Sequence, residues 1–242
     1  MIYWDANAKR FRDASGRFVS LRTVQIEIEK GFLVTQDQME ALTQRLEDEK
    51  IDDDTFQIQF AELIAASLLL AGAVGAGGLK QMVDADFAVI NRKVAEQYKF
   101  FNNTFANFKK GFKLSNAAKT RIKKAGDKVR QTMKGSTADA IAANVDKAIK
   151  KARRAEMFKI LKRRARQYAY PMRDAYYQGE TAIMKLLGKT ESWRVLTAAE
   201  SCPTCLKWSG KNKGWVLIEL QPPIGGNELI CRQYCRCFLK YR

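Results

Sequence analysis

The sequence predicts a mainly α-helical protein, with an elongated helical body and a small cysteine-rich module of strands and loops at the C-terminus. Two observations predict this fold class. Apolar residues recur at helical spacing through most of the chain before residue 190, and all five cysteines lie after residue 201. We divide the chain into an extended basic-aromatic arm, an acidic helical N-terminal region, a basic helical body and a cysteine-rich C-terminal module, at residues 1–22, 23–79, 80–190 and 191–242.

The arm carries basic and aromatic side chains on both sides of a turn signal at residues 13–16, so a short hairpin that docks onto another surface is expected there. Nothing in its first residues resembles a signal peptide, which favours synthesis in a cytoplasm. In a cytoplasm, clustered cysteines more often bind metal than form disulfides.

Helical spacing begins at Leu21 and extends to about Glu49. Gly31 is expected to interrupt it, and Thr35 with Gln38 resembles a capping box that would open a second helix. The three aspartates of residues 52–54 then predict the start of a third helix, because acidic side chains stabilise a helix N-terminus.

That third helix continues into an uncharged apolar run over residues 63–79, which is rich in alanine and glycine. The run is at the lower limit of length for a membrane span. We favour a buried helix that ends in a glycine loop, and a membrane association is not expected.

Residues 82–110 predict a helix with seven large apolar residues at steps of three and four, which favours core packing over an aromatic platform for stacking bases. A Leu-Ser-Asn cap at residues 114–116 predicts the next helix over 116–133. A long helix is expected over 138–170, and Pro171, directly after it, breaks or kinks the helical pattern. A helix over 172–187 follows.

Charge is distributed unevenly along the chain. Residues 1–79 carry 8 basic and 13 acidic side chains, whereas residues 109–173 carry 21 basic and 4 acidic ones, an excess equal to the whole net charge of +17. This asymmetry favours a polyanionic partner such as nucleic acid over a basic face that only keeps the protein soluble. The candidate nucleic-acid-binding residues are Lys109, Lys110, Lys123, Lys124, Lys150, Lys151, Arg153, Arg154, Lys162, Arg163, Arg164 and Arg166.

The chain contains no histidine. This excludes Ser-His-Asp and Cys-His nucleophile systems, histidine-ligated nucleases and Cys2His2 fingers. We therefore expect no enzyme activity and no small-molecule substrate.

The C-terminal module has short β-type runs at residues 193–196 and 215–218, joined by proline and glycine turns. A Cys-x2-Cys pair on one tight turn, completed by two thiolates from a distant segment, is a typical structural zinc site without an open position for substrate. The candidate metal ligands are Cys202, Cys205, Cys231, Cys235 and Cys237. In an extended chain Cys235 and Cys237 would point to the same side. Zinc is favoured, with disulfides and free buried thiols as alternatives.

Several motifs resemble the C-terminus of tailed-phage head morphogenesis proteins, the minor head proteins related to protein F of phage Mu. They are Trp193 through the Cys-Pro-Thr-Cys at 202–205, the Leu-Gln-Pro-Pro-Ile-Gly-Gly at 220–226, Cys231, and the Cys-Arg-Cys at 235–237. The aromatic-rich segment 97–108 followed by Leu-Ser at 114–115 also resembles the family, and the likeness extends over residues 60–242. Tyr234 departs from it, because many members have asparagine there.

The resemblance implies a structural virion protein, made in the host cytoplasm and located in the phage head. It would contact the portal or the major capsid protein, at the portal vertex or inside the capsid, and the packaged double-stranded DNA. The rival interpretations are a zinc-ribbon DNA-binding regulator and a head-associated nuclease or transferase.

Overall fold

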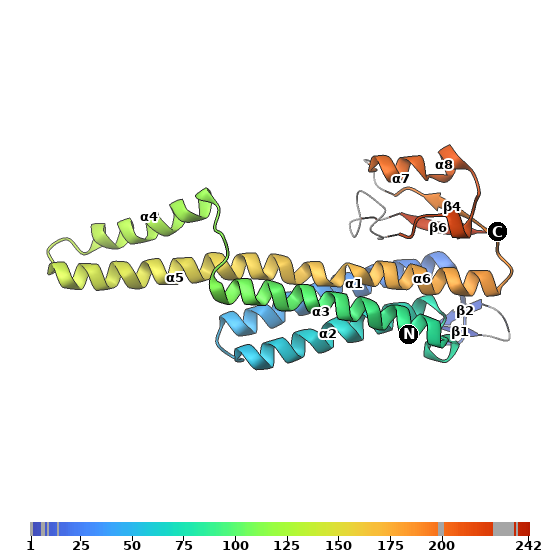
Figure 1. Ribbon diagram of the computed structural model, residues 1–242, viewed down its shortest axis with the longest axis horizontal. Coiled ribbons are helices and arrows are strands. Elements are labelled where there is room, and N and C mark those ends of the chain that lie inside the picture. The colour runs from blue at the N-terminus through green and yellow to red at the C-terminus, as the bar shows by residue number, and fades with distance from the viewer. Residues whose placement is uncertain are drawn as a thin grey trace.

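The computed structural model describes residues 2–5, 8, 10–13, 15–197, 201–224, 235 and 237–242, with only the backbone for residues 2–4. It confirms the mainly α fold class: long helices form an elongated body and a small module of strands and short helices lies beside it (Figure 1). The long helices are α1 (Leu21–Glu47), α2 (Asp53–Gly75), α3 (Asp84–Lys110), α4 (Asn116–Thr132), α5 (Ala138–Ala165) and α6 (Pro171–Leu186).

Helix α1 is continuous, so the expected interruption at Gly31 was wrong. Ser20 caps the helix by accepting a hydrogen bond from the Thr23 amide, and Thr35 caps nothing, because its hydroxyl donates to the Gly31 carbonyl at 3.0 Å. One glycine costs a helix only about 1 kcal/mol. Apolar side chains on the same face, before and after Gly31, outweigh that cost: Val24, Ile28, Phe32, Met39, Leu42 and Leu46.

Helix α2 crosses α6 at close range through glycines. A Cβ atom added to Gly75 would lie 2.1 Å from the Tyr176 carbonyl oxygen, and one added to Gly179 would lie 2.5 Å from the Gly72 carbonyl oxygen. Only glycine allows this approach of two backbones. Among the described helices, α2 is the one long and apolar enough to cross a membrane, and half of its apolar window is buried in the protein.

The aromatic stripe of α3 packs into the core, as predicted. Phe101 and Phe105 are buried, and the Phe101 ring stacks on Phe60 of α2 with centroids 4.4 Å apart. Tyr168 closes this cluster edge-on to both rings. Tyr168 lies in a 3-10 segment, η2 (Arg166–Ala169), so α5 ends five residues earlier than expected. Pro171 opens α6 at its first turn, where a missing amide hydrogen bond has no cost.

Helices α4 and α5 form an antiparallel hairpin that extends beyond the other helices (Figure 1). Ser115 and Thr137 cap the two helices through their hydroxyls. The α4–α5 contact is narrow, and its buried residues are Ala118, Gly126 and Val145. Because α5 is long, its first half belongs to this hairpin and its second half packs against α1 in the bundle.

Two small antiparallel sheets complete the described structure. At the N-terminus, β1 (Ile2–Asp5), β2 (Arg10–Asp13) and β3 (Phe18–Val19) form three strands where a hairpin was expected, and Phe11 is buried in the core. In the C-terminal module the strand order is β5-β4-β6, from Val216–Leu217, Glu191–Val195 and Phe238–Tyr241. Short helices α7 (Pro203–Lys207) and α8 (Gly210–Lys213) and the 3-10 segments η1 (Leu79–Gln81) and η3 (Ile218–Leu220) lie in the connections.

Candidate nucleic-acid interface and candidate metal centre

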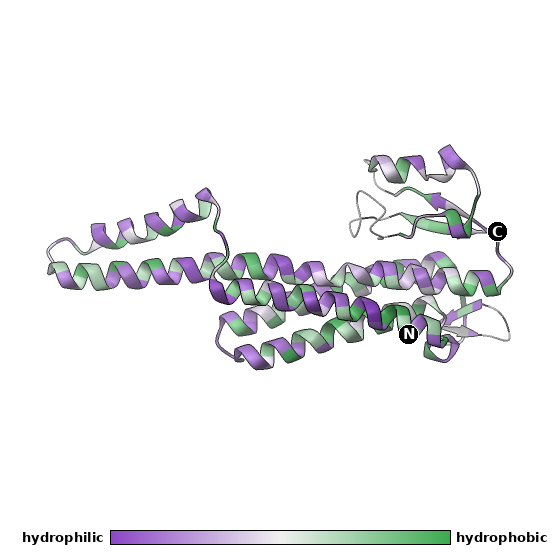
Figure 2. Ribbon diagram, viewed as in Figure 1, coloured by the Kyte–Doolittle hydropathy of each residue, from purple (hydrophilic) through white to green (hydrophobic). Residues whose placement is uncertain are grey.

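The hairpin concentrates exposed positive charge. Between residues 113 and 153 there are 12 basic side chains and three acidic ones, Asp127, Asp139 and Asp146. Every one of the 12 is exposed: Lys113, Lys119, Arg121, Lys123, Lys124, Lys128, Arg130, Lys134, Lys147, Lys150, Lys151 and Arg153. Figure 2 shows hydrophilic residues along both helices of the hairpin. We call this segment, residues 113–153, the basic hairpin.

Most of these charges face solvent without an acidic partner. Among the described residues, three of the 12 form ion pairs: Arg121 with Glu156, Arg130 with Asp127 and Lys150 with Asp146. The Arg121 guanidinium donates two hydrogen bonds to Glu156, at 2.6 and 2.7 Å, and these bonds raise the pKa of Arg121. The other nine are free to contact phosphate groups.

The predicted nucleic-acid-binding residues divide into two groups. Lys123, Lys124, Lys150, Lys151 and Arg153 lie on the basic hairpin. The remaining seven lie at the end of α3 or in the bundle half of α5 and η2: Lys109, Lys110, Arg154, Lys162, Arg163, Arg164 and Arg166. Seven basic residues of the hairpin were not among the predicted nucleic-acid-binding residues, although the basic composition of the segment could have suggested them. They are Lys113, Lys119, Arg121, Lys128, Arg130, Lys134 and Lys147.

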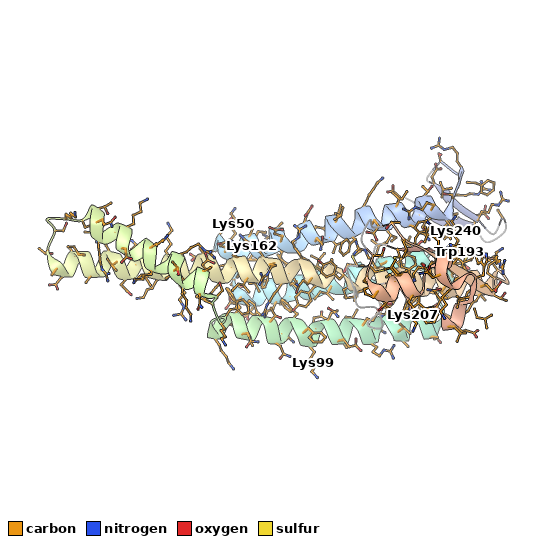
Figure 3. The ribbon with its side chains drawn as sticks, turned by 90° about the horizontal axis from the view of Figure 1, so that it is seen from above. Lys50, Lys99, Lys162, Trp193, Lys207 and Lys240 are labelled. Carbon is orange, nitrogen blue, oxygen red and sulfur yellow. The ribbon has the colours of Figure 1, made fainter. Side chains whose placement is uncertain are left out.

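Acidic side chains of the N-terminal region neutralise part of the second group. Arg154 pairs with Glu49 at 2.9 Å, and Lys162 pairs with Glu47 beside the end of α1 (Figure 3). Arg166 lies 2.6 Å from Glu40 and 3.4 Å from Asp37.

Two further members of this group also have partners, one acidic and one aromatic. Lys109 pairs with Asp53 at the start of α2, and this hydrogen-bonded ion pair raises the pKa of Lys109. The Arg164 guanidinium lies over the Phe112 ring, 4.6 Å from its centroid. Part of the positive charge of α5 and η2 is thus paired with acidic side chains of the N-terminal region at the surface of the bundle.

Three of the predicted metal ligands converge in the C-terminal module. The sulfur atoms of Cys205, Cys235 and Cys237 all lie within 4.8 Å of one another, and all three residues are buried. The Cys205 and Cys235 sulfurs are 3.5 Å apart, far longer than a disulfide bond of about 2.05 Å. Four sulfurs at about 2.3 Å from one zinc ion would be separated by about 3.8 Å. The three described thiols therefore lie close enough together to bind one metal ion.

Of the other two predicted ligands, the structure describes only Cys202. Cys202 caps α7, where its sulfur accepts a hydrogen bond from the Cys205 amide at 3.3 Å, and it is not within the three-sulfur cluster. Cys231 lies outside the described residues. As expected, the sulfurs of Cys235 and Cys237 lie close to each other.

Hydrogen bonding within the cluster separates the acidities of its thiols. The Cys205 and Cys237 thiols donate to Cys235, and these bonds lower the pKa of Cys235 although burial opposes the change. The pKa of Cys237 is raised, because its proton is held in the bonds to Cys205 and Cys235 and burial disfavours its charge. Cys235 therefore loses its proton more readily than Cys237 does.

Sequence reasoning missed the cation beside these thiols. From the sequence, nearby Lys207, Arg232 and Arg236 would help to keep the thiols deprotonated. Lys207 is exposed, and Arg232 and Arg236 lie outside the described residues. Instead Arg194 of β4 is buried, with its Nη1 atom 3.8 Å from the Cys205 sulfur and 3.9 Å from the Cys235 sulfur. Because side chains alternate along a strand, the sequence predicts that Arg194 shares a face with Ser192. It does not predict which of the two faces is buried.

A buried carboxylate joins the module to the helical body. Glu180 of α6 accepts hydrogen bonds from the Tyr176 hydroxyl, from the Gln25 amide and, at 2.9 Å, from the Tyr241 hydroxyl of β6. Burial raises the pKa of Glu180 to about 7, against these hydrogen bonds, which lower it. Gln25 of α1 also donates to the Leu239 carbonyl of β6, so its side chain joins α1 to both α6 and β6.

No protein-family model, curated protein or solved structure with which the chain was compared matches it.

Proposed function

We propose that this protein is a minor head protein of a tailed phage, which contacts packaged double-stranded DNA without sequence preference through the basic hairpin. The observation that carries the proposal is the projecting pair of helices whose 12 exposed basic side chains include nine without an acidic partner among the described residues. The resemblance of the cysteine motifs to head morphogenesis proteins supports the virion setting.

Duplex DNA fits the hairpin for a physical reason. Its phosphates form a dense line of negative charge, and lysine or arginine contacts to them release condensed counterions whatever the base sequence. The exposed basic side chains lie on both helices of a projecting element. The hairpin can therefore contact a duplex without contact between the bundle and the DNA. We assign contact with portal or capsid subunits to the acidic N-terminal region, residues 23–79, and to the arm that forms the N-terminal sheet.

Within the module we propose a structural zinc ion held by Cys205, Cys235 and Cys237, with Cys202 or Cys231 as the fourth ligand. The convergence of the three sulfurs supports this assignment. Four protein thiolates leave no open coordination position, so the ion would stabilise a module too small to form a large core. Elemental analysis should give one zinc per chain, and Cys235→Ser should lose it.

The DNA contact is tested by fluorescence anisotropy with labelled duplexes of unrelated sequence. We expect equal affinities for all of them and a linear decrease of the logarithm of affinity with the logarithm of salt concentration. Salt-insensitive binding, or none, would refute the genome contact. A preferred sequence would favour the zinc-ribbon regulator, and cleavage of the duplex with magnesium or manganese would favour a nuclease.

The virion setting is tested separately, by quantitative mass spectrometry of purified phage particles. A few copies per particle are expected for a minor head protein, and absence from particles would refute this part of the proposal.

A further inference from the structure

Two buried arginines of this protein have different surroundings. Arg173 of α6 is 4% exposed and forms two hydrogen bonds, at 2.7 and 2.6 Å, with the carboxylate of Glu29. Arg194 of β4 is 1% exposed, and among the described residues no carboxylate forms an ion pair with it. A guanidinium keeps its proton in proteins, so both side chains are buried cations.

The surroundings of Arg194 are polar on one side and made of sulfur on the other. Nη2 donates to the Pro222 carbonyl, and Gln221, with its amide oxygen turned toward the guanidinium, accepts from Nε at 2.8 Å. Nη1 faces the Cys205 and Cys235 sulfurs at 3.8 and 3.9 Å. Carbonyl oxygens satisfy hydrogen bonds but carry no net charge, so the sulfurs are the groups that can balance the cation.

A buried charge without an opposite charge is costly, because the protein interior replaces water poorly as a solvent for ions. If the cysteines were neutral thiols or disulfides, Arg194 would be a buried cation without an opposite charge beside it. A divalent ion with three bound thiolates has a net charge of −1, and with four it has −2. Either centre supplies the missing negative charge next to Nη1.

We propose that Arg194 is the counter-charge of a metal–thiolate centre built on Cys205 and Cys235, and that it strengthens metal binding by neutralising part of the centre's negative charge. This inference rests on the metal site proposed above, not on the DNA contact. It makes Arg194 a positioning residue, since its guanidinium touches the ligands and not the metal. When the ion binds, the thiol protons pass to solvent and no electron is transferred.

The position of Arg194 in the fold supports this role. It lies in the middle strand of the β5-β4-β6 sheet and is paired in register with Leu239 of β6, two residues after Cys237. Cys205 approaches from α7 and Cys235 from the segment before β6. The guanidinium therefore bridges the two chain segments that supply the thiols, which lie 30 residues apart in sequence.

The test is a metal titration of the full-length protein, reduced and freed of metal with a chelator. Co²⁺ is the probe, because thiolate-to-cobalt charge-transfer absorption reports sulfur ligation directly, and Zn²⁺ competition then gives the zinc affinity. The variants are Arg194→Gln, which keeps hydrogen-bonding capacity without charge, and Arg194→Lys, which keeps charge without the planar fork. Arg173→Gln is the matched control, since it removes a buried arginine that pairs with the carboxylate of Glu29.

We expect Arg194→Gln to weaken metal affinity about 10- to 100-fold, in the range typical of groups that support metal ligands. Arg194→Lys should weaken it less, and Arg173→Gln should leave it unchanged. Circular dichroism verifies that each variant keeps its helical body. If Arg194→Gln does not fold, Arg194→Lys carries the test, and loss of cobalt binding by that variant in a folded state contradicts the proposal.

Three other results overturn the inference. Wild-type affinity in Arg194→Gln would show that the charge is not needed. Equal weakening in the Gln and Lys variants would show that hydrogen-bond geometry matters and charge does not. Failure of the wild-type protein to bind Co²⁺ through sulfur would refute the metal site together with the role of Arg194, and would leave DNA binding by the hairpin untouched.

Discussion

The bundle and the basic hairpin share one helix, α5, but among the described residues its basic side chains form ion pairs with the acidic N-terminal region only in the bundle half. In the bundle half, Arg154 and Lys162 pair with glutamates at the end of α1. In the hairpin half of α5, three of the four basic side chains, Lys147, Lys151 and Arg153, form no ion pair with a described residue. Basic residues are denser in the bundle half of α5 than in its hairpin half, so the density alone does not locate a binding surface. What matters is which charges the fold has already neutralised.

The two regions also differ in how their helices meet. In the bundle, α2 and α6 approach until backbone touches backbone at Gly75 and Gly179. In the hairpin, α4 contacts α5 at Gly126, but there the neighbours are the side chains of Ile149 and Val145. Backbone cannot move aside for a new methyl group, whereas side chains can shift, so the two glycines should respond differently to the same substitution.

The largest expected effect comes from Gly75→Ala, compared with Gly126→Ala. The new Cβ at position 75 would lie 2.1 Å from the Tyr176 carbonyl oxygen, so we expect a loss of about 3 kcal/mol or more in unfolding free energy. At position 126 the nearest side-chain atom is at 3.1 Å, and the better helix propensity of alanine offsets the crowding to within about 1 kcal/mol. Urea denaturation followed by circular dichroism measures both. Equal losses would show that the α2–α6 contact is no closer than the hairpin contact.

Helix boundaries were largely predictable from the sequence, because they depend on local chemistry. Asp52 and Ser115 cap α2 and α4 where their side chains predict caps. The error at Gly31 has a tertiary origin, since burial of the α1 face outweighs a local penalty. Strand β6 was missed because four residues at the chain end become a strand only by pairing with β4, more than 40 residues earlier.

The candidate sites were predictable in composition and not in arrangement. Cysteine spacing indicated the thiol cluster, and charge counting indicated a polyanion-binding segment. Nothing local to α1 or α5 predicted that Glu47 would meet Lys162, and nothing local to β4 predicted that Arg194 would face the thiols. Contacts between distant segments depend on how the helices and strands pack, which short-range patterns do not encode.

A pH titration sharpens the comparison, because the bundle contains a buried carboxylate and the hairpin charges are exposed. Burial raises the pKa of Glu180 from about 4.5 to about 7, so between these values the folded protein binds more protons than the unfolded chain. Stability from this residue is therefore complete below pH 4.5 and is lost as the pH rises toward 7, by up to about 3 kcal/mol.

The check is denaturation at several pH values for the wild type and Glu180→Gln. The wild type should lose stability across this range relative to the variant, whose side chain does not titrate. The tyrosines around Glu180, Tyr176, Tyr177 and Tyr241, have pKa values raised above 10 by burial and stay neutral there. Parallel pH profiles for the two proteins would contradict the buried position of Glu180.

The smallest effect concerns single ion pairs. Lys162→Met removes the pair with Glu47, whose side chains are about a quarter exposed, and should cost about 1 kcal/mol or less. Lys123→Met removes an exposed hairpin charge without an ion-pair partner among the described residues, and stability should stay within about 0.5 kcal/mol of the wild type. A larger cost at position 123 would mean that the hairpin charge supports the fold.

The central claim, that free charge on the basic hairpin binds DNA, is tested most directly by two variants that each remove three charges. One carries Lys123→Gln, Lys124→Gln and Lys151→Gln, and the other carries Arg154→Gln, Lys162→Gln and Arg166→Gln. Both are titrated onto the same labelled duplex over a range of salt concentrations. The hairpin variant should bind at least about tenfold more weakly at low salt, with a salt slope reduced by about 2 to 3, while the bundle variant stays within about threefold of the wild type. Equal losses in the two variants, or a greater loss in the bundle variant, would contradict the claim.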